Sequence, residues 1–345
     1  MQNAISFKEF DSLDDKTCIQ INTFLKENKF NYNTLFSSPI WINKAIQNYD
    51  VNFKIILFFN NDKLIGTHLR FCEYRGYIRI SNYNKAIKPF FSYGFKFFFP
   101  YTIWKIPILL SKTISKEQVI EIHEAFETII KKEKHVKFSP LEIENYTKFE
   151  NKYISYWATY LLNLKSKSYD EVFSKYSRSL KRSLKHINNQ SEICCQRLDF
   201  SDWFKVKQYV DWVKVAQKMT GKKFKYDTKT LIQENESFNR QGFTYEIFIA
   251  TSNDTDIHGS LAIYGDSNYI NEFEANTSLE ANKLNARIHD LIRDSVIKFC
   301  LKKGIQYYDF SGFNPNEDRS SKEEGIKFGK SKFNATEIKY PIVNW

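Results

Sequence analysis

The succession of short segments in residues 241–345 limits the fold of this chain more than any other feature of its sequence. Residues 245–250, 258–264 and 268–276 are rich in apolar and aromatic side chains, and the turn sequences TSNDTD and GDS separate them. Such segments between turn residues predict three strands joined by tight turns. A helix, a strand, a short helix or turn and a final strand are predicted to follow, at residues 284–301, 305–310, 323–330 and 336–342. The order β-β-β-α-β-α-β predicts a mixed, largely antiparallel sheet flanked by helices.

The first part of the chain is also predicted to mix helices and strands. Its segments predict helices at residues 39–49 and 115–134 and strands at residues 53–60, 63–71 and 136–139, with Asn60-Asn61-Asp62 as a turn. A chain of 345 residues is long enough for two domains. Polar residues dominate at 145–153, which places the predicted boundary there. We therefore expect an α/β (α+β) protein with domains at residues 1–150 and 151–345.

Two helices with basic faces are predicted after a strand at residues 156–164. Residues 169–188 are expected to form one helix, and its basic residues fall largely off the apolar stripe: Lys175, Arg178, Lys181, Arg182 and Lys185. Arg178 and Arg182 are four residues apart and therefore share a helix face. A second helix is predicted at residues 201–219, and a lysine cluster comprises Lys218, Lys222, Lys223 and Lys225. These segments could bind tRNA or a diphosphate, whereas a solvated helix face is the alternative.

The net charge agrees with a polyanionic partner but does not identify one. Lys and Arg total 51 and Asp and Glu total 40, which gives a formal net charge of +11. A basic protein attracts nucleic acid, nucleotide sugars or anionic lipid. The abundance of Phe, Tyr, Lys, Asn and Ile also fits an AT-rich genome, which accounts for part of the lysine excess.

Cysteine, histidine and hydropathy patterns argue against several classes of protein. The five cysteines include no CxxC pair and the histidines show no metal-ligand spacing, so neither a disulfide framework nor a metal site is expected. No HExxH, Walker A or GxSxG motif occurs. The N-terminus lacks a signal-peptide pattern, and no uncharged apolar stretch reaches the ~18 residues of a membrane helix. We expect a cytoplasmic protein with at most peripheral membrane contact through the aromatic run at residues 89–107, for which a buried strand pair is the favoured interpretation.

The C-terminal segments carry a resemblance to a known family. The run LNARIHDLIRDSVIKFCLKKGIQYYDFSGFNP, followed by GIKFGKSKFNA, resembles the C-terminal domain of the Fem-type peptidoglycan-bridge aminoacyltransferases, and the predicted element order resembles the GNAT acetyltransferase plan. The family pattern is a strand ending Asp-Phe-Gly-Gly and a later Gly…Phe-Lys-x-x-Phe-Gly segment. This chain has Gly329 in place of the first Phe, and Ser311 and Asn334 in place of glycines. SSPIWINKAI, LLNLKSKSYDEVFSKYSRSLKRSLKHI and TGKKFKYD resemble further family segments, and no long coiled-coil arm interrupts the second domain.

The resemblance implies a fold, a reaction and several site residues. It implies two GNAT-like domains, each with a mixed, largely antiparallel sheet, and transfer of an amino acid from aminoacyl-tRNA to an amine of a peptidoglycan precursor. By its place in the Phe-Lys pattern, Lys330 is the candidate catalytic or charge-stabilising lysine. Lys44 is the candidate contact to an acceptor phosphate, and Trp41 and Phe333 stand in matching segments as further candidates for substrate binding.

The chemistry of acyl transfer suggests roles for Lys330 and Asp309. Attack of an amine on an ester or thioester forms a tetrahedral oxyanion, which a fixed cation such as Lys330 stabilises; a solvated lysine is the alternative. Asp309, at the end of a predicted strand, could orient the amine or accept its proton, although a turn or capping role is favoured. Glu272 and Glu274 alternate with Phe273 and are expected on one face of a strand, where a solvated face is favoured over a catalytic base.

Three functions remain open from the sequence. The first is an aminoacyl- or acyltransferase acting on an amine of a nucleotide- or lipid-linked cell-envelope precursor. The second is an acyl-CoA-dependent N-acetyltransferase for an amino sugar or similar amine. GNAT enzymes hold the CoA pyrophosphate in a glycine-rich turn, which corresponds to residues 276–287 here. These residues contain no glycine, which argues against the second function. The third is a non-catalytic RNA- or envelope-binding module. The donor would be aminoacyl-tRNA or acyl-CoA without a tightly bound cofactor, tRNA is a candidate partner, and DNA is not expected.

Overall fold

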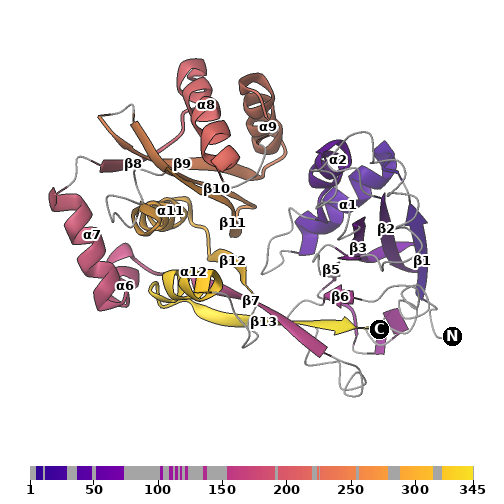
Figure 1. Cartoon of the computed structure of the whole chain (residues 1–345). Helices are drawn as coiled ribbons and strands as arrows, with labels where there is room; N and C mark the ends of the chain where they lie inside the picture. The colour runs from indigo at the N-terminus through magenta and orange to yellow at the C-terminus, as the bar shows by residue number, and fades with distance from the viewer. Residues whose placement is uncertain are drawn as a thin grey trace. The chain divides into compact units, whose positions relative to one another are not determined.

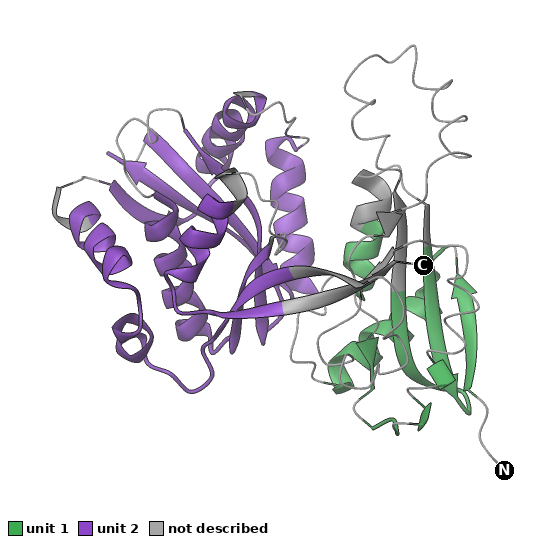
Figure 2. Cartoon of the chain, turned by 60° about the horizontal axis from the view of Figure 1, so that its bottom comes forward, with its two compact units in different colours: residues 1–30, 36–157, 339–345 green, residues 31–35, 158–338 purple. Residues whose placement is uncertain are grey.

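The contacts of the chain divide it into two units (Figure 2). Unit 1 comprises residues 1–30, 36–157 and 339–345, and unit 2 comprises residues 31–35 and 158–338. The computed structural model describes all residues except 1–4, 11, 29–36, 49–51, 74–101, 104–108, 112, 116, 119–120, 123–134, 138–153, 191–192, 220–223, 225, 254–255, 279–287, 314–320 and 345. The predicted boundary at 145–153 lies outside the described residues. No helix in the described ranges is long and apolar enough to cross a membrane.

Unit 1 contains a five-stranded sheet with helices α1 (Asp15–Asn28) and α2 (Pro39–Asn48). Its strands are β1 (Ile5–Phe10), β2 (Asn52–Asn60), β3 (Lys63–Glu73), β4 (Thr102–Ile103) and β5 (Leu109–Leu110). The helix predicted at 39–49, the strands predicted at 53–60 and 63–71 and the turn between them are confirmed. Asn61 and Asp62 connect β2 to β3 with φ angles of 47° and 63°, which match a two-residue hairpin turn of type I′.

Residues near the middle and the end of the chain form a further pair of strands in unit 1. The strand predicted at 136–139 is confirmed as β6 (His135–Lys137). It pairs antiparallel with residues 342–344 of β13 (Thr336–Asn344). Most of the helix predicted at residues 115–134 lies outside the described residues.

Unit 2 is built on a mixed sheet whose strands lie in the order β13, β7, β12, β11, β10, β9 and β8. Their bounds are β7 Ile154–Asn163, β8 Ile193–Arg197, β9 Thr244–Ser252, β10 Asp256–Gly265, β11 Tyr269–Thr277 and β12 Tyr307–Phe313. The pair β11–β12 is parallel, whereas β7–β12, β10–β11, β9–β10 and β8–β9 are antiparallel. The predicted α/β class and the mixed, largely antiparallel sheet are therefore confirmed.

Helices cover both faces of this sheet (Figure 1). They are α6 (Tyr169–Ser174), α7 (Arg178–Gln190), α8 (Trp203–Met219), α9 (Thr228–Arg240), α11 (Ile288–Lys303) and α12 (Ser321–Ser331). Leu261 and Ile263 of β10 pack in a core with Ile292 of α11. Tyr264 points the other way, where its ring stacks on that of Tyr245 at a centroid distance of 4.4 Å and packs against Phe238 of α9. Alternate residues of the strand thus bury both faces of the sheet, α11 on one side and α9 on the other.

The basic segment predicted as one helix at residues 169–188 is in fact two helices, α6 and α7. Ser177 separates them. Its backbone N–H donates to the carbonyl oxygen of Lys332 at 2.9 Å, and its hydroxyl accepts from the N–H of Leu180 at 3.2 Å. The hydroxyl therefore caps the first turn of α7, as serine does at a helix N-terminus. The single-helix prediction is wrong because this capping and long-range contact outweigh a helical pattern that continues across the break.

Asn334, which follows α12, has a φ of 57° and stands where the resembled family has glycine. The left-handed conformation costs a non-glycine residue about 1–2 kcal/mol, although asparagine tolerates it better than most. We expect Asn334→Gly to raise the free energy of unfolding by up to about 1 kcal/mol and Asn334→Ala to lower it, as measured by urea denaturation. An Asn334→Gly variant less stable than the parent would contradict this account.

Candidate active site

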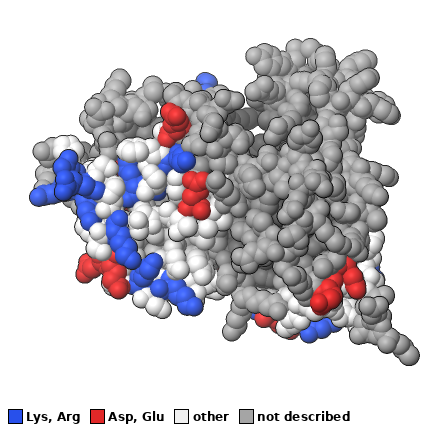
Figure 3. All heavy atoms as spheres, turned by 90° about the horizontal axis from the view of Figure 1, so that it is seen from below, with Lys and Arg blue, Asp and Glu red and all other residues white. Residues whose placement is uncertain are grey.

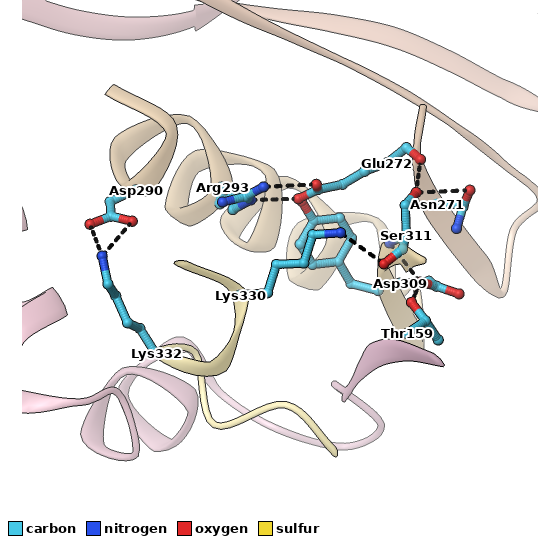
Figure 4. A network of polar contacts seen from close by, with 10 residues as sticks. Thr159, Asn271, Glu272, Asp290, Arg293, Asp309, Ser311, Lys330 and Lys332 are labelled. Atoms are coloured by element: carbon cyan, nitrogen blue, oxygen red, sulfur yellow. Dashed lines mark hydrogen bonds and ion pairs between the residues drawn. The ribbon is translucent and has the colours of Figure 1, made fainter. Parts of the chain in front are cut away.

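The site lies in unit 2, where a strand bulge interrupts the sheet (Figure 4). The last parallel pair of β11 and β12 is Asn271 with Asp309, and the register of β12 with β7 shifts between Asp309 and Gly312. Ser311 lies in this bulge with a φ of 63°. Glycine favours that conformation, and glycine is the residue that the resembled family has at this position. A bulge redirects the backbone. Here the Ser311 carbonyl oxygen accepts a hydrogen bond from a side chain of α12.

Ser311 connects the bulge to two elements, strand β11 and helix α12. Its hydroxyl donates to the carbonyl oxygen of Glu272 and lies 3.4 Å from Oδ1 of Asn271. Its carbonyl oxygen accepts from Nζ of Lys330 at 2.8 Å. The position of Lys330 relative to the ends of β11 and β12 is therefore fixed through Ser311.

Asp309 anchors the bulge from the face of the sheet opposite to that of Tyr308, its neighbour in β12. Its Oδ1 accepts from the Thr159 hydroxyl and from the Ser311 N–H at 2.7 Å, and its Oδ2 accepts from the Tyr269 hydroxyl at 2.6 Å. The side chain is 5% exposed. An ionised carboxylate only accepts hydrogen bonds, and donors from three elements hold this one in place. This arrangement favours a positioning role over proton acceptance.

Lys330 is a buried lysine, with 5% of its surface exposed. Burial lowers the pKa of Lys330, the carboxylates of Glu272 and Asp309 oppose that shift, and Arg293 adds to it. Because little water surrounds this amino group, a charge on it is screened less than at the protein surface.

A bidentate ion pair lies beside Lys330. Arg293 of α11 donates from Nε to Oε1 of Glu272 at 2.8 Å and from Nη2 to Oε2 at 3.1 Å, and the Tyr308 hydroxyl donates to the same Oε1 at 2.6 Å. Burial acts to raise the pKa of Glu272, but Arg293 and Lys330 outweigh it, and the net shift is downward. Burial acts to lower the pKa of Arg293, but the Glu272 carboxylate raises it overall. Both members of the pair are therefore charged.

The expectation that Glu272 and Glu274 share a solvated strand face is wrong. Ala262 pairs with Glu274 and Ile263 pairs with Glu272, so that Phe273 is an extra residue in β11. A bulge of one residue reverses the alternation of side chains beyond it. Glu272 consequently points to Arg293 of α11, whereas Glu274 accepts a hydrogen bond from Gln217 of α8 on the opposite face.

His289 lies one turn before Arg293 on α11 and is neutral. Burial lowers its pKa to about 4, and the charge of Arg293 acts in the same direction. Its Nε2 lies 2.6 Å from the hydroxyl of Thr277. The imidazole therefore adds no charge to the site at neutral pH.

A second buried ion pair holds the end of α12. Nζ of Lys332 lies 3.1 Å from Oδ2 of Asp290, and the two side chains are 7% and 5% exposed. Phe333, a predicted substrate-binding residue, packs between the rings of Tyr176 and Phe310 at centroid distances of 5.2 Å and 5.1 Å. The structure thus places Phe333 in the core that holds the segment after Lys330.

The other predicted site residues lie apart from Lys330 and Asp309. Arg178 and Arg182 are exposed on α7, and Lys218 is exposed near the end of α8, on the other face of the sheet (Figure 1). Trp41 is buried in unit 1. Lys44 belongs to α2, and its side chain lies outside the described part of the structure. The structure therefore joins Lys330 with Asp309 through Ser311 and keeps the basic helices separate.

Two residues that the sequence analysis did not single out complete the site, Arg293 and Tyr308. Arg293 follows the apolar residues Leu291 and Ile292 in a helical segment. A charged residue beside a buried apolar stripe indicates an ion pair, and this is the sequence pattern that could have identified Arg293. Tyr308 precedes Asp309, and the alternation of a strand would place the two on opposite faces. Neither signal identifies Glu272 as the common partner.

Comparison with known proteins supports the fold. No protein-family model and no curated protein sequence matches the chain. Among solved structures, FemX has a TM-score of 0.58 at 11% identity, with 97% of this chain and 96% of FemX covered. L-PGS from Bacillus licheniformis has a TM-score of 0.51 at 11% identity, with 96% and 91% covered. A conserved protein of unknown function from Bacteroides thetaiotaomicron VPI-5482 has a TM-score of 0.50 at 10% identity, with 99% and 100% covered. The chain therefore has the fold of FemX over nearly its whole length.

Proposed function

We propose that unit 2 holds the active site of an acyl- or aminoacyltransferase and that Lys330 is its essential cation. The observation that carries this proposal is a buried ammonium group held against the carbonyl oxygen of a strand bulge. Burying an ammonium group is costly, and here it donates to a neutral carbonyl oxygen, while the Glu272 and Asp309 carboxylates act on it at longer range. The resemblance of residues 325–334 to the Phe-Lys pattern supports the same residue.

In the proposed reaction, an amine of the acceptor attacks the carbonyl carbon of a donor ester or thioester. A C–N bond forms while the carbonyl π electrons move onto oxygen, and the Lys330 ammonium stabilises that oxyanion. When the intermediate collapses, the C–O or C–S bond breaks, and the leaving group takes the proton that the amine releases. Asp309 acts as a positioning residue, because it holds the Ser311 bulge that fixes Nζ of Lys330.

The exposed face of α7 favours aminoacyl-tRNA over acyl-CoA as the donor. Arg178, Arg182 and Lys185 are exposed, and among the described residues they form no ion pair with a carboxylate. Figure 3 shows Lys and Arg side chains gathered at the left end of unit 2, where Figure 1 places α6 and α7. A polyanion that neutralises such cations releases condensed counterions, which drives binding. Residues 276–287, whose lack of glycine argues against a CoA site, lie mostly outside the described residues.

Charge reversal on α7 tests the donor assignment. We expect Arg178→Glu/Arg182→Glu to weaken tRNA binding more than about tenfold at low salt and to reduce the slope of log K against log salt by about 2, since each lost phosphate contact contributes about one unit. Fluorescence anisotropy at several salt concentrations would measure both quantities. Lys302→Glu/Lys303→Glu makes the same charge change at the exposed end of α11 and serves as the control. An equal loss in both double variants would show that net charge alone attracts tRNA.

We propose an amine of a nucleotide- or lipid-linked cell-envelope precursor as the acceptor, in the cytoplasm. The support is the resemblance to Fem-type enzymes together with the fold of FemX. A transfer assay with purified protein, charged tRNA or acetyl-CoA, and an amine acceptor tests the reaction. Saturable acetyl-CoA binding without tRNA binding would replace this proposal by an acyl-CoA-dependent N-acetyltransferase. Binding of tRNA without transfer to any amine would favour a non-catalytic binding module.

A further inference from the structure

Arg293 has one edge that its ion pair does not use. Nε and Nη2 both donate to Glu272, at 2.8 Å and 3.1 Å. The ring of Phe310 lies against the guanidinium group, with its centroid 5.9 Å from Cζ. Among the described residues, Nη1 donates no hydrogen bond. The guanidinium is therefore fixed by Glu272 and Phe310, and the donors of Nη1 are left for another group.

Gly329 of α12 lies over that unused edge. A Cβ added at Gly329 would lie 3.7 Å from Nη1 of Arg293, and no other described atom outside its own helix turn and chain neighbours would lie within 4 Å. A Cβ at this position would thus be in van der Waals contact with Nη1, and glycine leaves that contact to another group. Glycine inside a helix costs about 1 kcal/mol relative to alanine, so its presence immediately before Lys330 calls for a reason. An open approach to Nη1 is one consequence of glycine at this position.

We propose that Arg293 and Gly329 form a subsite beside Lys330 that binds a carboxylate group of the substrate. The proposal rests on the function proposed above, because it places this carboxylate next to the reacting carbonyl. Arg293 supplies the donors of Nη1, and Gly329 keeps the approach to them open. The substrate class is then an amine or acyl compound with a free carboxylate at its reacting end.

The balance of formal charges favours a carboxylate over a phosphate. The ion pair of Arg293 and Glu272 is formally neutral as a whole, and His289 carries no charge. A ligand with a single negative charge gains the hydrogen bonds of Nη1 without strong repulsion from Glu272. A phosphate dianion is more costly to bring into this partly buried site, because the desolvation cost grows with the square of the charge while the attraction to Arg293 grows only in proportion to it.

The side-chain ¹⁵N signals of selectively labelled arginine provide a direct test. The Nε–H of Arg293 is buried in its ion pair, which slows its exchange with water, and Arg293→Lys identifies its signal. We expect sodium acetate to shift this signal saturably in the full-length protein and Gly329→Leu to weaken the apparent affinity roughly tenfold or more, because the leucine side chain covers Nη1. Gly325→Leu is the matched control. It lies one turn earlier on α12 with no described atom within 4 Å of its Cβ, and it should bind acetate as the parent does.

Three results would overturn the proposal: no shift of the Arg293 signal by acetate, equal affinity in Gly329→Leu and Gly325→Leu, or tighter binding of inorganic phosphate than of acetate. The transfer assay keeps this outcome separate from the proposed function. If the parent protein transfers acyl groups while acetate does not perturb Arg293, the subsite is refuted and the function stands. If acetate binds as expected but no transfer occurs with any donor, the subsite stands and the function fails.

Discussion

Replacing Lys330 with methionine is expected to lower kcat/KM of transfer by about 10²–10³-fold, the effect of removing one preorganised donor from an oxyanion site. Methionine has a similar length and no charge, so it fills the buried space without leaving an ammonium group to be solvated. This gain opposes the loss of the hydrogen bond to the Ser311 carbonyl oxygen and of a cation near Glu272, so we expect the urea midpoint to change little. Initial rates of transfer and urea denaturation of the same preparation measure the two effects.

The pH dependence of the reaction distinguishes a charge-stabilising lysine from a structural one. Activity requires the protonated form of Lys330, and it should be lost as pH rises through a pKa that lies below the ordinary lysine value of 10.5, because burial lowers it. Lys327→Met makes the same substitution one turn earlier on α12, at a half-buried lysine 3.6 Å from Glu337, and it should preserve both the rate and the profile. Full activity in Lys330→Met, with an unchanged alkaline limb, would remove Lys330 from the reaction.

The order of elements along the chain from β9 to β13 was predictable because local chemistry marks the ends of each element, whereas β8 and α9 before them were not predicted. The sequences TSNDTD and GDS separate apolar segments that become β9, β10 and β11, and the helix and strand that follow have equally clear periods. In unit 1, β1 was not predictable in the same way. Its residues 5–10 are mostly exposed, so they lack the apolar alternation that identifies a half-buried strand.

Single residues that change a backbone direction were the least predictable features. Ser177 divides the segment 169–188 by accepting from Leu180 and donating to Lys332, a partner far along the chain. Phe273 is the extra residue that turns Glu272 and Glu274 to opposite faces. Neither residue has a sequence pattern of its own, because the partner that stabilises each deviation is supplied by another element of the fold.

Only part of the candidate site could be predicted, because some of its contacts join elements that are distant in the sequence. Lys330 and Asp309 stand in segments that resemble a family pattern, whereas the Glu272–Arg293 pair joins β11 to α11 through contacts that no period reveals. Ser311 and Asn334 are instructive, since each replaces a family glycine and each retains a positive φ, of 63° and 57°. The backbone conformation is therefore kept where the residue type is not, and Ser311 adds a hydroxyl that binds β11.

Asp290→Ala is expected to lower the free energy of unfolding of unit 2 by about 3–5 kcal/mol, the loss typical of breaking a buried ion pair from one side. Asp290 and Lys332 are 5% and 7% exposed, so the remaining ammonium group would be buried without its carboxylate. Urea denaturation followed by circular dichroism measures the change. Asp211→Ala removes one member of the exposed pair with Lys207, which is closer at 2.6 Å, and it should leave the denaturation midpoint almost unchanged.

The double variant Asp290→Leu/Lys332→Met separates the desolvation of an unpaired charge from the loss of an attraction. Replacing both partners by apolar side chains removes both buried charges, and such replacements are often neutral or stabilising. We therefore expect the double variant to be clearly more stable than Asp290→Ala. Because Lys332 lies two residues after Lys330, we also expect Asp290→Ala to reduce transfer activity under conditions where it is still folded. If Asp290→Ala were as stable as Asp211→Ala, the pair would not hold the end of α12, and the position of Lys330 would depend on Ser311 and Phe333 alone.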